Sequence, residues 1–292
     1  MKKLESFFRE AAELTDEALE RIVPSENTPP EILHQAMRWS LFGGGKRFRP
    51  ALVLLVGRSF GAPDGRLVRT AAAVEMLHTY SLIHDDLPSM DDDDLRRGRA
   101  ACHKKYGEST AILAGDALQA MAFQTIAEDM EISSETRTEL LAGLGNAAAR
   151  MVAGQFLDLE AEGRKIAADA LRRLHELKTG ALIAFSAKAG ALLANADPAK
   201  ITSAADYGVK IGLLFQITDD LLDITQSSEV LGKTSGKDIA AEKATFPSTL
   251  GVDGAFAFAR EIKSEAEHIA VSLFGGDSVP AAIPEFLINR KK

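Results

Sequence analysis

Two clusters of aspartates are the residues of this sequence with the clearest chemical use. Each follows a strongly apolar segment, a poor place for carboxylates unless a cation meets them. Their members are Asp85, Asp86, Asp91, Asp219, Asp220 and Asp223. Oxygen donors without cysteine favour a hard ion such as Mg²⁺, which takes one or two protein carboxylates and shares substrate phosphates. The two clusters therefore predict the halves of a site for magnesium and a phosphorylated substrate.

The spacing within each cluster indicates how a helix would present it. Asp219 and Asp223 are four residues apart, so they share one helix face. Asp85 and Asp91 are six residues apart, which is about 240° around a regular helix. They can face each other only if the helix breaks between them. Pro88 disfavours helix at the residue before it and is expected to provide that break.

Basic residues near these clusters suit the anion that the metal would hold. A glycine turn, Gly43 to Gly45, precedes three cations and a buried helix, and its backbone amides favour anions. The planar fork of Arg49 suits a bidentate phosphate contact. His78 lies seven residues before Asp85 and shares its helix face. The basic residues concerned are Lys46, Arg47, Arg49, Arg96, Arg97, Lys178, Lys233, Lys237 and Lys243. For each lysine alone, a solvated side chain is the competing interpretation.

The rest of the sequence favours helices that would position these residues. The ten prolines fall between periodic segments, apart from Pro88, and residues 89–197 contain none. Alanine and leucine are abundant, and runs of β-branched residues are scarce. The expected helices are 4–23, 31–42, 51–60, 67–86, 109–130, 134–162, 169–195, 200–225, 253–274 and 280–289. The links are short, so we expect one all-α domain spanning residues 1–292.

Composition excludes several classes of protein. The chain has 34 basic and 42 acidic residues, a formal net charge of −8, which argues against a nucleic-acid partner. One cysteine, Cys102, excludes a disulfide framework and suits a reducing compartment. No run approaches the roughly 20 apolar residues of a membrane span, and the first residues lack an apolar signal region. We expect a cytoplasmic protein without a membrane span.

In their order along the chain, these motifs resemble the trans-prenyl diphosphate synthase family, of the bacterial farnesyl diphosphate synthase type. The matching segments are GGGKRFRP (43–50), EMLHTYSLIHDDLPSMDDDDLRRG (75–98), AILAGDAL (111–118), GQFLDL (154–159), KTGAL (178–182), FQITDDLLD (215–223) and GKTSGKD to EKATFP (232–247). The resemblance implies an all-α isoprenoid synthase bundle around a deep central cavity, assembled as a homodimer. Two alanines, Ala100 and Ala101, depart from the family's usual Pro-Thr.

The resemblance also implies a role for individual residues. The six aspartates would hold several Mg²⁺ ions on an allylic diphosphate. Residues matched to that diphosphate are Arg96, Lys178 and Lys233. Residues matched to isopentenyl diphosphate are Lys46, Arg49, His78 and Arg97. Residues matched to catalytic positions beside the reacting carbons are Lys178, Thr179 and Gln216. Lys243 matches a lysine of a closing loop, and which of Lys233, Lys237 and Lys243 contacts diphosphate stays open.

The implied activity is condensation of isopentenyl diphosphate with dimethylallyl or geranyl diphosphate to farnesyl diphosphate, a C15 product. The allylic diphosphate would ionise, and the double bond of isopentenyl diphosphate would attack the cation in a dry cavity. Tyr80, with Ser81 beside it, lies five residues before Asp85, where a bulky ring would form the floor under the growing chain. The family's C15 enzymes carry an aromatic residue near this point, which favours C15 over the C10 and C20 alternatives.

Other classes fit the residues less well. An HD-type phosphohydrolase would use the doublet His84-Asp85, but it needs more histidines at the metal and leaves the second cluster unexplained. A non-catalytic binding subunit would lack aspartates of one cluster, and a terpene cyclase would lack the GGGKR segment. The terminal residues Arg290 to Lys292 would either close the site over diphosphate or form a solvated end, and we favour the solvated end.

Overall fold

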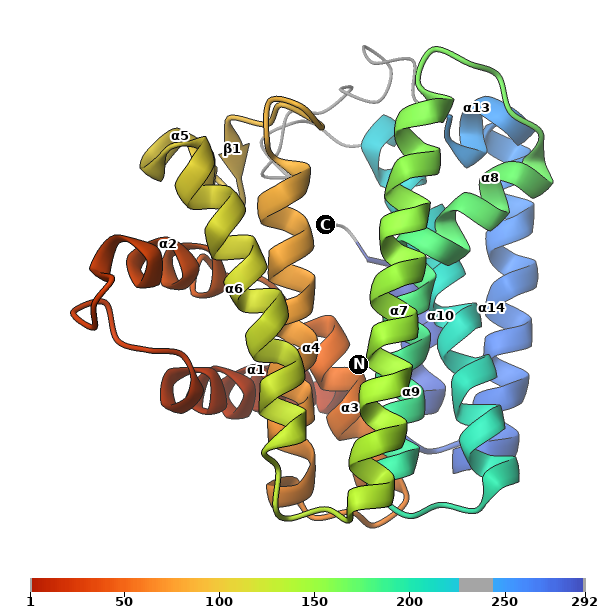
Figure 1. The fold of residues 1–292 in the computed structure, drawn as a ribbon. Coiled ribbons are helices and arrows are strands. Elements are labelled where there is room, and N and C mark those ends of the chain that lie inside the picture. Colours follow the sequence, from red (N-terminus) through yellow and green to blue (C-terminus); the bar gives the residue numbers. More distant parts are fainter. Residues whose placement is uncertain (1, 226–243, 291–292) are drawn as a thin grey trace.

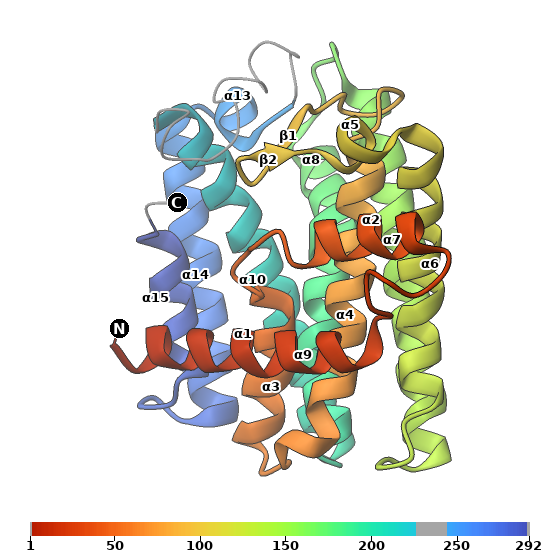
Figure 2. The same ribbon diagram turned by 90° about the vertical axis from the view of Figure 1, so that its left-hand side faces the viewer.

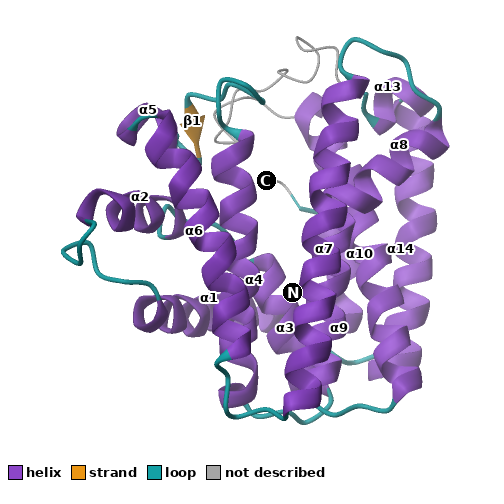
Figure 3. Ribbon diagram, viewed as in Figure 1, coloured by secondary structure: helices purple, strands orange, loops and turns teal. Residues whose placement is uncertain are grey.

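The computed structural model describes residues 2–225 and 244–290, and most of these residues are helical (Figure 3). The expected all-α fold is confirmed. Its α-helices are α1 (Lys2–Ile22), α2 (Glu31–Leu41), α3 (Phe48–Ser59), α4 (Asp64–Asp85), α5 (Cys102–Tyr106), α6 (Glu108–Ala127), α7 (Ser134–Ala161), α8 (Ala168–His175), α9 (Ala181–Leu193), α10 (Pro198–Thr225), α13 (Phe246–Leu250), α14 (Val252–Phe274) and α15 (Ile283–Ile288). The other elements are a π-helical segment η1 (Glu176–Gly180), a 3₁₀ turn η2 (Pro280–Ala282), and the strands β1 (Leu95–Arg96) and β2 (Arg99–Ala100).

Helix α9 lies in the core of the bundle and packs against α3, α7 and α10. Its side chains are almost all buried, as expected for a segment that is apolar on most faces. The approach of α9 to α3 is close at Gly190, where an added Cβ would lie 2.5 Å from the carbonyl oxygen of Val53. Helix α7 approaches η1 in the same way at Gly154, where an added Cβ would lie 2.2 Å from the backbone nitrogen of Lys178.

The helices that carry the two aspartate clusters, α4 and α10, both end at the upper end of the bundle in Figure 1. Helix α4 packs on α3 and α6, and α10 packs on α9 and α14. Helix α1 crosses α3 and α4 at a steep angle and covers their lower part (Figure 2). No helix in the described ranges is long and apolar enough to cross a membrane.

The structure departs from the expected elements at two functional segments. The helix expected over 169–195 runs without a break through α8, η1 and α9, but its η1 segment has π-helical geometry. Such segments are frequent at functional sites, and this one carries Lys178 and Thr179. The hairpin of β1 and β2 was not expected. Its two turn residues, Arg97 and Gly98, have φ values of 54° and 75°, as a tight hairpin turn requires.

Candidate active site

A cavity of about 390 Å³ brings together seven of the residues singled out from the sequence. They come from α3, α4 and η1 and are Arg49, His78, Tyr80, Ser81, Asp85, Lys178 and Thr179. Helix α7 supplies an apolar wall that includes Met151, Val152 and Phe156. The cavity therefore combines cationic and carboxylate groups with a surface suited to a hydrocarbon chain.

The first aspartate cluster lies where α4 ends. The expected break at Pro88 is confirmed, because α4 stops at Asp85 and the chain turns back. The backbone N–H of Asp91 then donates to the carbonyl oxygen of Asp85 at 2.9 Å. Burial, with the charges of Asp91 and Asp86 acting in the same direction, raises the pKa of Asp85 to about 6 despite the opposing charges of Lys178 and Arg96. A cation at this carboxylate would offset that penalty.

Arg96, which is partly exposed, forms an ion pair with the buried Asp86 at the rim of this cluster. Arg96 Nε donates to Asp86 Oδ1 at 2.9 Å, and Nη2 donates to the same oxygen. Arg96 also lies 3.6 Å from Asp93. Strand β1 of the hairpin thus holds Arg96 against Asp86 and Asp93, which precede it in the sequence. The structure places the predicted diphosphate contact and a predicted metal ligand in direct contact with each other.

The cations after the glycine turn have two different environments. Arg49 lines the cavity, with Nη1 3.3 Å from His78 Nε2, and burial lowers its pKa to about 10. Burial first, and then the charge of Arg49, hold the pKa of His78 well below its ordinary value. By contrast, Arg47 turns into the core, where it donates to Glu75 Oε1 at 2.9 Å and to Asp16 Oδ1 at 2.8 Å.

The remaining predicted ligands of isopentenyl diphosphate lie around the same turn. Lys46 is exposed. Arg97 Nη1 donates to the carbonyl oxygen of Gly44, and its guanidinium covers Gly45, where an added Cβ would lie 2.6 Å from Arg97 Cζ. The positive φ of Gly45, 126°, adds to the requirement for glycine. The turn and Arg97 therefore form one unit next to Arg49.

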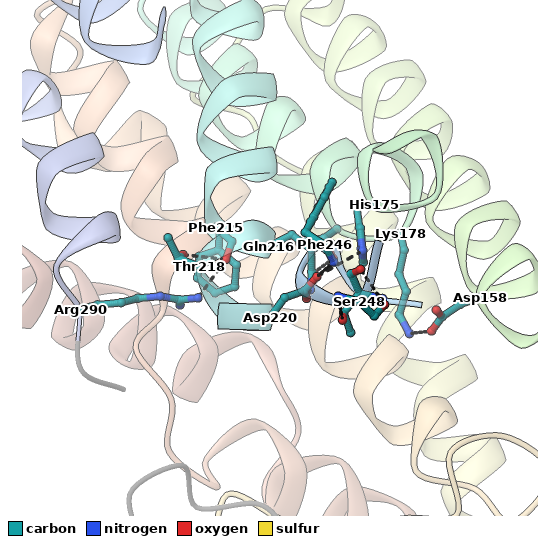
Figure 4. Close-up of polar contacts among 12 residues, drawn as sticks. Asp158, His175, Lys178, Phe215, Gln216, Thr218, Asp220, Phe246, Ser248 and Arg290 are labelled. Carbon is teal, nitrogen blue, oxygen red and sulfur yellow. Dashed lines mark hydrogen bonds and ion pairs between the residues drawn. The ribbon is translucent and has the colours of Figure 1, made fainter. Parts of the chain in front are cut away.

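A chain of hydrogen bonds joins η1 to the second aspartate cluster (Figure 4). Thr179 Oγ1 donates to Gln216 Oε1 at 3.0 Å, and Gln216 Nε2 donates to Asp220 Oδ1 at 2.8 Å. The other oxygen of Asp220 accepts from the backbone N–H of Phe246 at 2.9 Å. The two predicted catalytic positions, Thr179 and Gln216, are therefore in contact, and Asp220 is fixed by protein donors.

The third predicted catalytic position, Lys178, bonds to a residue that sequence reasoning missed. Lys178 Nζ donates to Asp158 Oδ2 at 2.6 Å, which ties η1 to α7 (Figure 4). Gln155, one turn earlier on α7, lines the cavity, and its buried amide has no hydrogen-bond partner among the described residues. The segment GQFLDL carries both residues, so the resemblance contained the signal for them.

His175 is a second buried residue that the sequence did not single out. Its Nε2 lies 3.8 Å from Asp220 Oδ2, and its ring packs on Phe246 with centroids 5.2 Å apart. Burial lowers the pKa of His175 to about 4, so the ring is neutral at physiological pH. Its ring contact is with the same residue, Phe246, whose backbone N–H holds Asp220. No pattern in the sequence marks this contact.

The expectation of a solvated C-terminal end is wrong for Arg290, whose side chain is only 5% exposed. Its Nη2 donates to the carbonyl oxygen of Phe215 at 2.9 Å and to Asp219 Oδ1 at 3.1 Å. Its guanidinium lies 4.1 Å from the centroid of the Phe215 ring. The remaining predictions on basic residues fall outside the described ranges 2–225 and 244–290, and they concern Lys233, Lys237, Lys243, Lys291 and Lys292.

The donor set of the two clusters fits magnesium, because all predicted ligands are carboxylates. Asp86, Asp220 and Asp223 are buried, where a carboxylate needs a positive partner. Asp220 and Asp223 line a second cavity, of about 720 Å³, together with Arg164 and Ser248. The structure therefore places Asp85 and these two aspartates along different cavities at the same end of the bundle.

One further group of potential ligands occurs among the described residues. Asp92, Asp94 and His103 place a donor atom each within 4.8 Å of one another. Lys104 Nζ lies 2.7 Å from Asp94 Oδ1, so a cation of the protein already meets this group. It is separate from the six predicted ligands.

Comparison with known proteins identifies the family. The sequence pattern of polyprenyl synthetases matches residues 30–268, and the chain belongs to that family. It is 43% identical over 288 residues to farnesyl diphosphate synthase of Escherichia coli K12, covering 95% of each chain. It is also 43% identical to a chloroplastic geranylgeranyl pyrophosphate synthase of Capsicum annuum, covering 87% of this chain and 69% of the relative.

A solved structure agrees with these relatives. A geranyltransferase from Helicobacter pylori, complexed with magnesium and isoprenyl diphosphate, superimposes with a TM-score of 0.85 at 32% identity. The match covers 97% of this chain and 96% of that chain. The resemblance drawn from the aspartate motifs and the expected isoprenoid synthase fold are thereby confirmed.

Proposed function

We propose that this chain, acting as a single polyprenyl synthetase domain, is a magnesium-dependent prenyltransferase. It condenses isopentenyl diphosphate with dimethylallyl or geranyl diphosphate to farnesyl diphosphate. The observation that carries the proposal is the 390 Å³ cavity. It is lined by the Arg49–His78 pair, by Asp85 and Lys178, and by the apolar side chains of α7. The names of the relatives support the reaction class.

The residues in and near the cavity divide the work of this reaction. Arg49 and His78 bind the diphosphate of the isopentenyl substrate, with Lys46 and Arg97 at its edge. Arg96 and Lys178 face the allylic diphosphate, whose departing charge they stabilise. Bound Mg²⁺, held by the aspartates of both clusters, would supply further charge neutralisation on that leaving group.

The neutral groups orient and protect the reacting carbons. Thr179 and Gln216 hold each other at 3.0 Å beside Lys178, so both side chains have a fixed geometry at the reaction site. The apolar wall of α7 includes Val152 and Phe156, which are exposed in the single chain, so a covering partner would help to keep water from the carbocation. The reaction in this scheme proceeds without a covalent bond between substrate and protein.

Product length depends on the floor of the cavity. Tyr80 and Ser81 line it one turn before Asp85, and the bulk of Tyr80 favours a C15 product. Geranylgeranyl diphosphate synthesis is the second candidate, because a relative of that name has the same 43% identity, over a shorter match.

The assembly and location that we propose are a homodimer in the cytoplasm. The helices α6 and α7 carry large apolar side chains that are exposed in the single chain, namely Ile112, Leu113, Val152 and Phe156. A second copy of the chain would bury such a patch. The single reduced thiol of Cys102 supports a reducing compartment.

The direct test is incubation with isopentenyl diphosphate, Mg²⁺ and either allylic primer, with products identified by mass spectrometry. Farnesyl diphosphate as the main product is the expected result, and C20 product would favour the second candidate. Release of allylic alcohol or inorganic phosphate without condensation would support a phosphohydrolase instead. Absence of any turnover with every primer would point to a non-catalytic subunit.

A further inference from the structure

Arg290 is a buried cation at the edge of the second aspartate cluster. Removing a guanidinium from water is costly unless several partners replace the lost hydration. Three partners do so here: the carbonyl oxygen of Phe215, Oδ1 of Asp219 and the face of the Phe215 ring. All three partners lie within about one turn of α10. Arg290 itself follows α15, at the C-terminal end of the described residues.

The two sides of this turn of α10 are therefore held by different parts of the chain. Thr179 and the backbone N–H of Phe246 hold Gln216 and Asp220 on one side. Arg290 holds Phe215 and Asp219 on the other side, and Figure 4 shows its position beside Phe215. Asp219 itself is 41% exposed, and the bond from Arg290 restricts its carboxylate.

We infer that Arg290 is a positioning residue that orients Asp219 for metal binding. The inference rests on the proposed function, because it takes Asp219 as a ligand of magnesium. Hydrogen-bond partners behind a metal ligand typically change metal affinity 10- to 100-fold when they are removed. In this role Arg290 touches neither substrate nor metal.

A purely electrostatic role for Arg290 would have the opposite sign. A positive charge beside a carboxylate repels an incoming cation, so removal of that charge alone would strengthen metal binding. Loss of the orientation of Asp219 would instead weaken metal binding. The direction of the change in metal affinity therefore distinguishes a positioning residue from a mere neighbouring charge.

The experiment measures Mn²⁺ binding by electron paramagnetic resonance, with inorganic diphosphate present and no turnover required. Arg290→Met keeps the bulk and removes the donors, and we expect its dissociation constant for Mn²⁺ to rise about tenfold. Arg290→Lys keeps one donor and should recover part of the loss. Asn289→Ala is the matched control, because among the described residues the side chain of Asn289 bonds only to Glu285 of α15, and its removal tests fraying of this turn.

Unchanged or tighter Mn²⁺ binding in Arg290→Met would overturn the inference, and so would an equal loss in Asn289→Ala. Circular dichroism checks that each variant is folded, and Arg290→Lys carries the test if the methionine variant is not. Asp219→Asn in the same assay shows whether the measured ion uses this cluster, and the inference fails if that variant binds like wild type. Because no condensation is measured, weaker binding in Arg290→Met would stand even if the proposed prenyltransferase activity failed.

Discussion

Nη1 of Arg49 lies 3.3 Å from Nε2 of His78, although 29 residues separate them in the sequence. The pKa of His78 is held well below its ordinary value, first by burial and then by Arg49. The pKa of Arg49 is lowered to about 10, so the guanidinium still carries its charge at neutral pH. The pair therefore presents one net positive charge to the cavity, next to the glycine turn, which suits a diphosphate.

Arg49→Lys should weaken binding of isopentenyl diphosphate specifically. Lysine keeps the charge but loses the planar fork, so a bidentate contact to diphosphate is no longer possible. We expect KM for isopentenyl diphosphate to rise about tenfold, a loss of about 1.4 kcal/mol. KM for the allylic substrate should change little. Steady-state kinetics with each substrate varied in turn provides the measurement.

The control for this variant is Arg58→Lys, the same change on the same helix. Arg58 pairs with Asp64 and Glu10 near the surface and does not line the cavity. Its KM values should stay at those of wild type. An equal rise in both substrates' KM in Arg49→Lys would show that Arg49 does not belong to one subsite.

Tyr80→Ala should lengthen the product. The side chain of Tyr80 is 8% exposed, lines the cavity and packs edge-on against His84 with ring centroids 5.1 Å apart. Removing the ring opens space below Asp85, so we expect C20 and longer diphosphates beside or in place of C15. Chromatography of the dephosphorylated products gives the chain-length distribution.

Tyr106→Ala is the matched control for chain length. Tyr106 belongs to α5, packs against Trp39 with ring centroids 6.4 Å apart and does not line the cavity. Its product distribution should equal that of wild type. If Tyr80→Ala also gives the wild-type distribution, Tyr80 is a core residue and the floor lies elsewhere.

Glu75→Gln should destabilise the fold without touching the substrates. Glu75 and Arg47 are both 2% exposed and bond at 2.9 Å, so the change leaves a buried guanidinium without its main counterion. Breaking such a pair typically costs about 3–5 kcal/mol. We expect the free energy of unfolding, measured by urea denaturation, to fall by about 3 kcal/mol.

The exposed pair of Glu10 and Arg58 offers the comparison. Glu10 is 55% exposed, and Glu10→Gln should cost less than about 1 kcal/mol. A similar loss of unfolding free energy in both variants would mean that burial does not make the Arg47–Glu75 pair more important for stability than the exposed pair. In either variant the KM values should remain those of wild type.

Asp219→Ala should abolish most activity while the protein stays folded. The side chain is 41% exposed and pairs with Arg290, so its removal should leave the packing of the core intact. If Asp219 is a magnesium ligand, we expect kcat to fall at least about 100-fold. The melting temperature should change little. If Asp219→Ala turned over at the wild-type rate at saturating Mg²⁺, the second cluster would not be part of the metal site.

Local patterns in the sequence predicted the parts of the site that depend on local geometry. The four-residue spacing of Asp219 and Asp223 required only a helix, and α10 continues through both. The break before Asp91 required only Pro88, and α4 ends at Asp85. The family resemblance then supplied the roles that no spacing contains.

The partners that depend on contacts across the fold could not be predicted in this way. Arg47 and Arg49 are two residues apart, yet one turns to Glu75 in the core and the other to His78 in the cavity. Which arginine does which depends on α3 starting at Phe48, three residues earlier than expected. Arg290 was expected in solvent because the sequence does not show that Phe215 and Asp219 lie beside it.

Cys102 should react slowly with thiol reagents in the folded protein. Burial is the main cause that raises the pKa of its thiol from 9.0 to about 11, and the charge of Asp86 acts in the same direction. The thiolate is the reactive form, so at pH 8 its population is about 100-fold lower than that of an ordinary thiol. We expect modification by Ellman's reagent at pH 8 to be at least that much slower than in guanidinium, where the chain is unfolded.

The raised pKa of Cys102 also predicts the direction in which the stability changes at alkaline pH. Between pH 9 and 11 the folded protein keeps the proton of Cys102 while the unfolded chain releases it, so the folded state binds more protons. The contribution of Cys102 to the free energy of unfolding is therefore full below pH 9 and is lost as the pH rises to about 11. Urea denaturation at pH 8 and pH 10 should show a larger decline for wild type than for Cys102→Ala. Equal declines, or rapid modification of the folded protein at pH 8, would contradict a buried, protonated thiol.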